Sequence, residues 1–224
     1  MGTFSGIWGS NLLPQLIAKA IILFCCFPIH EYSHAWMASR LANPTGEREI
    51  RITRNPFAYL DLWGSIMFII FGVGYAKPIL VNPNSFRKPK KDFAIVSLAG
   101  PMSNLIIAVS FLFTKHVILM AVGEMTGCRT IMSFIMLCLS YTAYINFGLA
   151  VFNMIPIPPL DGYHVFLAFI PNRFHYRFVG LERYSLYAML GLLAVFTLLR
   201  VSPVTVAAQN LYASVDRVYH TIFQ

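Results

Sequence analysis

Charged residues are scarce in this chain. Only 12% of its 224 residues are charged, whereas 57% are apolar, and the mean hydropathy is +0.64. Soluble domains carry about 25% charged residues. The shortage of charge therefore excludes an ordinary soluble domain and indicates an integral membrane protein surrounded by a lipid bilayer.

Acidic residues are fewer than basic ones, with 9 acids against 17 bases and a net charge of +8. A basic balance can indicate nucleic-acid binding, but no stretch interleaves aromatic with basic residues as such a surface does. We therefore expect no nucleic-acid partner. The excess of bases is typical instead of loops on the cytoplasmic side of a membrane.

Cysteine pairs, repeats and leader features are also missing. The four cysteines include the neighbours Cys25 and Cys26 and form no CxxC pattern, which argues against a disulfide framework. Residues 1–13 have no basic segment ahead of an apolar run, so we expect no cleaved signal peptide. There is no internal repeat, and the length fits a single domain over residues 1–224.

Long apolar runs are abundant. Residues 14–39, 93–114 and 131–152 each reach the roughly 20 residues that a helix needs to cross a bilayer. Residues 163–170 and 184–200 are shorter apolar runs. The pattern predicts an all-α polytopic membrane protein with about four to six membrane segments.

Residues 47–76, which follow the first apolar run, do not form another long apolar run. Residues 47–60 begin with polar–apolar alternation, and Asn55-Pro56 is a turn signal, so we expect a short strand or β-hairpin. Residues 62–76 are apolar but short and contain three glycines. If they do not cross, twelve basic residues face the inside and four the outside, as the positive-inside rule requires. We therefore expect residues 62–76 to be re-entrant or a sheet edge packed against helices.

Two histidines and a glutamate interrupt the first run as His30-Glu31-Tyr32-Ser33-His34, which fits the pattern H-E-x-x-H. Residues four apart share one face of a helix, so both imidazoles can bind one zinc ion, and the glutamate can reach its water. With six histidines and five glutamates in the chain, roughly 0.004 matches are expected by chance. Burying three ionisable groups in lipid without a function is also costly.

The third metal ligand has two candidates. Cys26 lies four residues before His30 and shares its face, although a packing role fits a buried cysteine too. Asp161 lies in a proline-rich break at residues 153–162, where a carboxylate indicates a functional site. It can also cap a helix that begins near Gly162. By residue count, both His30 and Asp161 lie in the cytosolic third of the membrane.

Five segments carry a family resemblance: HEYSHAW at 30–36, RNPFAYLDLWGS at 54–65, GVGYAKPILVNPNSFRKPK at 72–90, LAGPMSN at 98–104 and NMIPIPPLDG at 153–162. Together they resemble the site-2 protease family of intramembrane zinc metalloproteases (M50 type), in its short bacterial branch without a PDZ or CBS domain. The core motifs extend from residue 30 to residue 162.

The resemblance implies one zinc ion per chain, held by His30, His34 and Asp161, with Glu31 as the general base. It also implies that Asn153 binds substrate or stabilises the oxyanion, although an asparagine here can equally cap the kink. The membrane segments would then surround a buried zinc site.

The resemblance further implies that Gly72 and Gly74 face the substrate, and we expect Asn104 to contact it as well. Polar groups that can line a water path from the cytosol are Ser33, Ser103, Asn104 and Asn153. Tyr59 stands where short members of the family often have a histidine, a departure that affects a substrate contact rather than the zinc ligands.

The expected function is hydrolysis of peptide bonds in or near transmembrane segments of membrane proteins. Zinc activates the attacking water, and the glutamate moves its proton. A substrate helix must first be unwound, and an exposed strand within residues 62–80 can hold it extended by β-augmentation. We expect a bacterial cytoplasmic membrane, an active site toward the cytosol, and either release of regulators or clearance of remnant peptides.

Three other functions remain as alternatives. A membrane di-iron hydroxylase or desaturase needs more histidines than the four that lie outside the motif. A non-catalytic zinc scaffold or chaperone has no need of Glu31, since a structural zinc closes its fourth position. A transporter can also carry buried charges, but it does not need the H-E-x-x-H pattern. The identity of the bound metal and a cleavage assay distinguish these functions.

Overall fold

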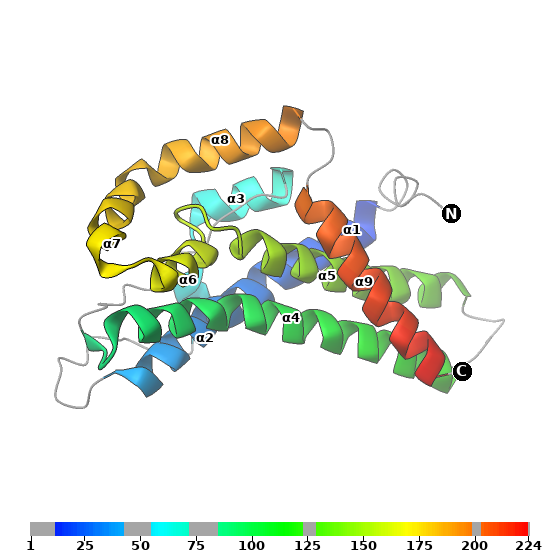
Figure 1. Cartoon of the computed structure of the whole chain (residues 1–224). Helices are drawn as coiled ribbons and strands as arrows, with labels where there is room; N and C mark the ends of the chain where they lie inside the picture. The colour runs from blue at the N-terminus through cyan, green and yellow to red at the C-terminus, as the bar shows by residue number, and fades with distance from the viewer. Residues whose placement is uncertain (1–11, 43–54, 72–84, 123–128, 199–202, 224) are drawn as a thin grey trace.

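The computed structural model of the chain is a bundle of helices (Figure 1). It describes residues 12–42, 55–71, 85–122, 129–198 and 203–223. All regular elements in these ranges are helical, and the β-pairing found there is an isolated bridge between Ala42 and Phe86. The predicted all-α fold is therefore confirmed for the described part of the chain.

Three long helical stretches form the centre of the molecule. The first is continuous from α1 (Leu12–Ile21) through the π-helical turn η2 (Ile22–Cys26) to α2 (Phe27–Leu41), and the others are α4 (Pro89–Val122) and α5 (Arg129–Asn153). Each stretch is long and apolar enough to cross a membrane. The three long apolar runs of the sequence are thus helices, and the chain is an integral membrane protein.

The π-helical turn lies directly before the two histidines, and Pro28 explains it. A proline has no N–H for the carbonyl four residues back, so the regular helical ladder cannot continue through this position. The helix widens instead, and the Phe27 N–H donates to the Ile22 carbonyl, five residues back. The widened turn keeps the first stretch continuous past the proline.

The remaining helices are shorter. They are η3 (Pro56–Tyr59), α3 (Leu62–Phe71), α6 (Asp161–Phe169), α7 (Asn172–Val179), η6 (Gly180–Tyr184), α8 (Ser185–Leu198) and α9 (Pro203–Ile222). The 14 residues of α8 measure about 21 Å at 1.5 Å per residue, short of a hydrocarbon core of about 30 Å. By length and apolar composition together, three candidate spans are found in the described ranges, and the expected four to six segments stay a prediction.

The strand or hairpin expected at residues 47–60 is not found in the part of it that the structure describes. Residues 47–54 lie outside the described ranges, and Pro56–Tyr59 form a 3-10 helix. The Asn55 side chain accepts a hydrogen bond of 3.1 Å from the Phe57 N–H and so caps this turn. The turn signal was correct, but the residues after it turn instead of extending.

Residues 62–71 are helical, so the alternative of a sheet edge is wrong for them. The reason is a helix cap: Asp61 Oδ1 accepts from the Gly64 N–H at 2.8 Å, and the Asp61 carbonyl accepts from the Ser65 hydroxyl. The ten residues of α3 measure about 15 Å and cannot cross a bilayer. Residues 72–76 lie outside the described ranges, and a re-entrant path stays a prediction.

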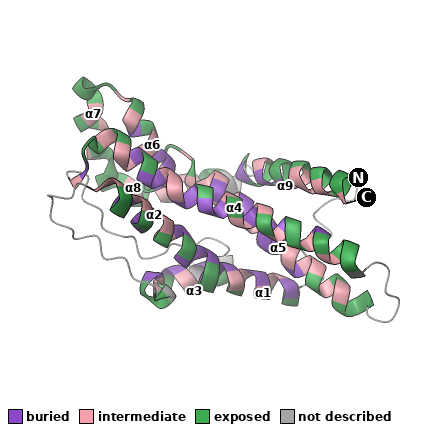
Figure 2. Ribbon diagram, turned by 90° about the horizontal axis from the view of Figure 1, so that it is seen from below, coloured by how far each residue is buried: buried purple, intermediate pink, exposed green. Residues whose placement is uncertain are grey.

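Helix α4 is the centre of the packing, since α2, α5, α6 and α9 all pack against it. Small residues allow close approach: Ala108 of α4, Ala143 of α5 and Ala208 of α9 are buried in one cluster with Leu112 and Phe147. Buried residues follow the faces on which these helices meet (Figure 2). The functional residues of α2 and α6 are therefore positioned by the same central helix.

A charged cluster fixes α9 to α4. Asp216 Oδ1 accepts a hydrogen bond of 2.8 Å from Lys115 Nζ, which also donates to the Tyr212 hydroxyl at 3.2 Å. His116 Nε2 lies 3.6 Å from the same carboxylate oxygen. These contacts pair the Lys115 ammonium, which lies inside a membrane-spanning helix.

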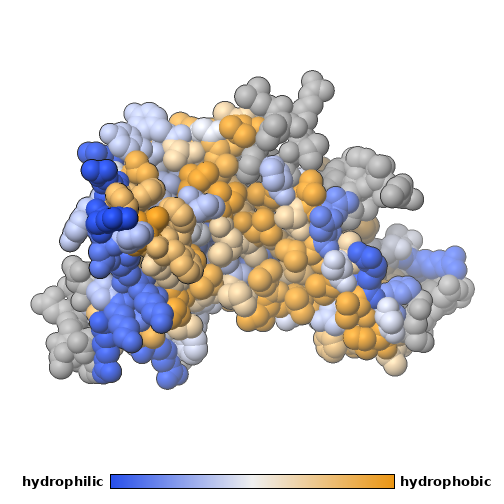
Figure 3. All heavy atoms as spheres, viewed as in Figure 1, coloured by the Kyte–Doolittle hydropathy of each residue, from blue (hydrophilic) through white to orange (hydrophobic). Residues whose placement is uncertain are grey.

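The surface supports the membrane assignment. In Figure 3 an apolar band crosses the middle of the molecule, and hydrophilic residues gather at the end where α7 lies. Large apolar side chains such as Ile106, Ile131 and Leu186 are more than half exposed. Apolar surface of this extent is costly in water and favourable in lipid.

Candidate metal centre

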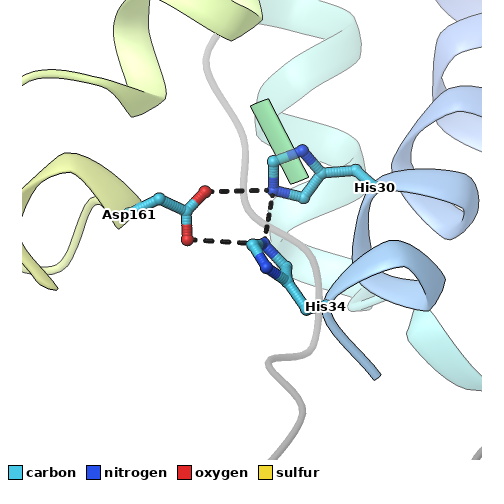
Figure 4. A group of neighbouring side chains, drawn as sticks. All are labelled: His30, His34 and Asp161. Carbon is cyan, nitrogen blue, oxygen red and sulfur yellow. Dashed lines mark hydrogen bonds and ion pairs between the residues drawn. The ribbon is translucent and has the colours of Figure 1, made fainter. Parts of the chain in front are cut away.

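Three ligand atoms converge between α2 and α6 (Figure 4). Nε2 of His30 lies 3.1 Å from Nε2 of His34 and 3.3 Å from Asp161 Oδ2. Nε2 of His34 lies 3.4 Å from Asp161 Oδ1. Both imidazoles are buried. Of the residues described, these three form the group able to hold a metal ion.

The two histidines meet because they lie one helical turn apart on α2. Asp161 reaches them because α5 ends at Asn153 and the chain then turns back. Proline lacks the N–H that a helix needs, so residues 156, 158 and 159 prevent α5 from continuing. Helix α6 begins at Asp161, and a Cβ at Gly162 would lie 2.8 Å from the Ile155 carbonyl oxygen and closer still to the Met154 carbonyl. A glycine is therefore needed directly after the acid.

The separations fit zinc. Zinc bonds to imidazole nitrogen and carboxylate oxygen measure about 2.0–2.2 Å, so the edge of a tetrahedral site measures about 3.3–3.6 Å. The 3.1 Å between the two Nε2 atoms is close to that edge, and each Nε2 lies at a similar distance, 3.3 or 3.4 Å, from one oxygen of the Asp161 carboxylate. With one atom taken from each residue, the three ligand atoms lie within 4.8 Å of one another. Two imidazole nitrogens and one carboxylate are also a donor set found in catalytic zinc sites.

Helix α4 supports both imidazoles at Nδ1, the ring nitrogen that does not face Asp161. Nδ1 of His34 donates to the Val96 carbonyl at 2.8 Å, and Nδ1 of His30 lies 3.1 Å from Nδ2 of Asn104. Because a carbonyl can only accept, His34 carries its proton on Nδ1, and in the neutral ring Nε2 keeps its lone pair for a metal. Gly100 lies between the two contacts, and a Cβ there would be 2.6 Å from Cε1 of His30.

The other residues expected at the site are distributed as follows. Glu31 is half-buried on α2, and its charge acts on His34. Asn153 is the last residue of α5 and is half-buried. Asn104 is only 1% exposed and lies against His30, so the structure places it behind the metal ligands. Gly72 and Gly74 lie outside the described residues.

Cys26 is not part of the ligand group in the described structure. It is buried in an apolar cluster with Ile22, Phe27 and Phe68, and it accepts a long contact of 3.4 Å from Asn146 Nδ2. Its role is packing. Of the two candidates for the third ligand, Asp161 is the one that lies beside the imidazoles.

Two contacts were missed by sequence reasoning. The Val96 carbonyl has no signal in the sequence, because every residue has a carbonyl. Gly100 has one, since Ala99-Gly100-Pro101 marks a place where helices can approach closely. The structure shows that what approaches α4 at this point is the pair of imidazoles.

Comparison with known proteins gives consistent results. The sequence pattern of Peptidase family M50 matches residues 114–198. The chain is 34% identical over 182 residues to YwhC of Bacillus subtilis, which covers 81% of each protein. It is 31% identical over 128 residues to MJ0611 of Methanocaldococcus jannaschii (56% of this chain and 60% of that one). It is 26% identical over 153 residues to Rip2 of Mycolicibacterium smegmatis (66% and 54%). All three names describe zinc metalloproteases, and no solved structure matches significantly.

Proposed function

Because this chain belongs to peptidase family M50 and is a zinc metalloprotease, we propose that it cuts peptide bonds in or near transmembrane segments of membrane proteins. The observation that carries the proposal is the convergence of His30, His34 and Asp161 within a set of helices that can span a membrane. Substrates of this kind are regulators released by cleavage or remnant peptides to be cleared. The proposed catalytic unit is a single domain over residues 1–224, with its core between residues 30 and 162.

In this proposal His30, His34 and Asp161 hold one zinc ion. When bound, zinc acts as a Lewis acid that polarises the scissile carbonyl and makes water a nucleophile near neutral pH. Three protein ligands leave a fourth position open, as in a catalytic site. The surrounding helices limit the access of bulk water, which strengthens the electrostatic interactions of the site.

Glu31 is the proposed general base. It follows His30 directly on α2, and its charge already acts on His34. From this position the carboxylate can take a proton from the attacking water and return it to the amine of the leaving peptide. General acid–base catalysis of this kind contributes about 10²–10⁴-fold to a rate.

Asn153 is proposed to donate a hydrogen bond to the oxyanion or to hold the substrate backbone. It stands at the end of α5, immediately before the break that leads to Asp161. A preorganised donor is worth about 10²–10³-fold when it is aimed at the charge that develops in the transition state. Its alternative role is to cap the end of α5.

The substrate helix must be unwound before it can be cut, since its backbone groups are already paired. The strand expected at residues 62–80 as a partner for the unwound chain is helical over residues 62–71. β-Augmentation is therefore proposed only for residues 72–80, which lie outside the described ranges and include Gly72 and Gly74.

We propose that the site faces the cytosol in a bacterial inner membrane. Lys90 Nζ donates to the Ile170 carbonyl and, at 3.1 Å, to Asn172 Oδ1, so the end of α6 lies beside the basic start of α4. His34 lies seven residues before the end of α2, which is about 10 Å of helix. The metal centre is thus near the basic end, and basic loops stay in the cytosol.

The test compares the wild type with Glu31→Gln, using purified full-length protein in detergent and a synthetic transmembrane helix as substrate. We expect about one zinc per chain in both proteins and cleavage in the wild type alone. Glu182→Gln is the matched control, because Glu182 is exposed and lies 3.9 Å from His164, outside the metal centre. It should cleave as the wild type does.

Two results would contradict the proposal. A wild type that binds zinc but cuts no transmembrane helix would indicate a zinc-binding scaffold. A chain that binds iron instead of zinc would indicate oxidative chemistry.

A further inference from the structure

One face of α4 holds both imidazoles of the proposed zinc site. Val96, Gly100 and Asn104 follow one another at intervals of four residues and therefore lie on the same side of the helix. Val96 contacts His34, Asn104 contacts His30, and Gly100 lies against both rings. Each imidazole thus has one partner on Nδ1, and the two partners differ in chemistry.

The difference decides where each ring carries its proton. The Val96 carbonyl can only accept, so Nδ1 of His34 is protonated and Nε2 can bind a metal. At His30 the nearest atom of the amide is Asn104 Nδ2, which donates to Nδ1. Neutral His30 then carries its proton on Nε2, the atom that faces Asp161. An Nε2 that carries a proton cannot bind zinc.

The same amide has an acceptor that is not used. Asn104 Oδ1 is buried without a hydrogen-bond partner in the described structure, and the residue is only 1% exposed. A buried acceptor left unpaired is unfavourable. The two ends of an asparagine amide are nearly equal in size, so a half-turn about the Cβ–Cγ bond exchanges Oδ1 and Nδ2 without new space.

We propose that Asn104 is a positioning residue for the metal: in the zinc-bound protein its Oδ1 accepts the Nδ1 proton of His30, so that Nε2 keeps the lone pair for zinc. The inference rests on the zinc ligands of the proposed function. An amide suits this position because it donates to the metal-free ring and accepts from the metal-bound one. Asn104 then acts on the metal through His30, not on the substrate.

The experiment measures zinc affinity, using full-length protein in detergent and a chromophoric chelator as competitor. The variants are Asn104→Leu, which removes both polar atoms, and Asn104→Asp, whose carboxylate can only accept. Asn146→Leu is the matched control. Asn146 is a second buried asparagine with an unpartnered Oδ1, and it contacts Cys26 and Thr142 instead of a histidine.

We expect Asn104→Leu to bind zinc about 10–100-fold more weakly than the wild type, the usual effect of losing a partner of a ligating histidine. Asn104→Asp should stay within about threefold of the wild type or bind more tightly, because a carboxylate is a common partner of a metal-bound histidine. Asn146→Leu should also stay within about threefold, even where it lowers the melting temperature.

Two results would overturn the inference. If Asn104→Asp binds zinc as weakly as Asn104→Leu, the residue acts as a donor or as a filler of space. If Asn104→Leu binds zinc as tightly as the wild type, the contact has no effect on the metal. Should the leucine variant not fold, a loss of tenfold or more in Asn104→Asp decides against the inference. A wild type that takes up no zinc would instead contradict the proposed function, and that measurement is made first.

Discussion

Replacing Gly100 by alanine tests the contact between α4 and the imidazoles. The new Cβ would lie 2.5 Å from Cε1 of His34, 2.6 Å from Cε1 of His30 and closer still to Nε2 of His34. Carbon atoms in contact need about 3.5–4.0 Å, so the neighbours must move by about 1 Å. Either α4 moves away from α2 or both rings rotate, and each change disturbs the ligand atoms.

The magnitudes differ between stability and activity. Overpacking a buried position costs about 1–3 kcal/mol, and the better helix propensity of alanine returns at most about 1 kcal/mol. We therefore expect the free energy of unfolding to fall by about 1–2 kcal/mol. Rings that lose their Nδ1 contacts should bind zinc about 10–100-fold more weakly. A displacement of 1 Å should lower the cleavage rate about 100-fold.

The assay measures melting temperature, zinc affinity and cleavage of a transmembrane peptide for Gly100→Ala and for Gly148→Ala. Gly148 is the matched control, because a Cβ there would lie 3.9 Å from Cβ of Ala208, an ordinary van der Waals contact. It should keep the zinc affinity and cleavage of the wild type. If Gly100→Ala equals Gly148→Ala in both, the imidazoles do not depend on close contact with α4, and the reasoning is refuted.

Two further substitutions test other parts of the structure. Gly162→Ala should lower the cleavage rate by about 100-fold, because a Cβ there overlaps the Met154 carbonyl and must displace the neighbouring Asp161 by about 1 Å. A normal cleavage rate would show that the chain between α5 and α6 does not pass this close to Gly162. Asp216→Asn should lower stability by about 1–3 kcal/mol, less than for a fully buried pair, because it leaves the Lys115 ammonium without its carboxylate. Thermal unfolding measures this change, and an unchanged melting temperature would show that the ion pair does not fix α9.

The ligand set was accessible from sequence because each ligand carries its own signal. The spacing of His30 and His34 places both on one helical face whatever the rest of the fold does. Asp161 stands out as an acid beside three prolines in an apolar region. The three long helices were accessible for a similar reason, since about 20 apolar residues in a row have few alternatives to a membrane helix.

The short apolar segments were harder to assign. Residues 62–71 hold one glycine and three isoleucines, and Asp61 caps them into a helix. Aspartate directly before an apolar run is a recognisable helix cap, a signal that the prediction of a re-entrant segment or sheet edge did not use. Residues 185–198 are as apolar as a span but too short. Local sequence does not determine how such a helix is placed in the membrane, because the neighbouring helices decide it.

The contacts behind the ligands depend on packing, and packing has no local signature. Asn104 was expected to contact substrate and to be able to line a water path. The structure buries it against His30, a contact that the sequence did not predict, and the substrate contact stays a prediction. Which side chain of α4 meets which ring depends on the register between α2 and α4. The close contact at Gly100 fixes that register, and it can be found only once both helices are placed.

The burial of ionisable groups in this apolar chain follows from these contacts. Nδ1 of His34 has the Val96 carbonyl and Nδ1 of His30 has the Asn104 amide, while the Nε2 atoms lie 3.3 and 3.4 Å from oxygens of Asp161. Each ring is thus satisfied on one side by α4 alone, which removes most of the cost of burying it. Nε2 of neutral His34 has no proton, so it faces a carboxylate oxygen that is also an acceptor. That unfavourable contact between two acceptors favours a cation between the histidines and Asp161.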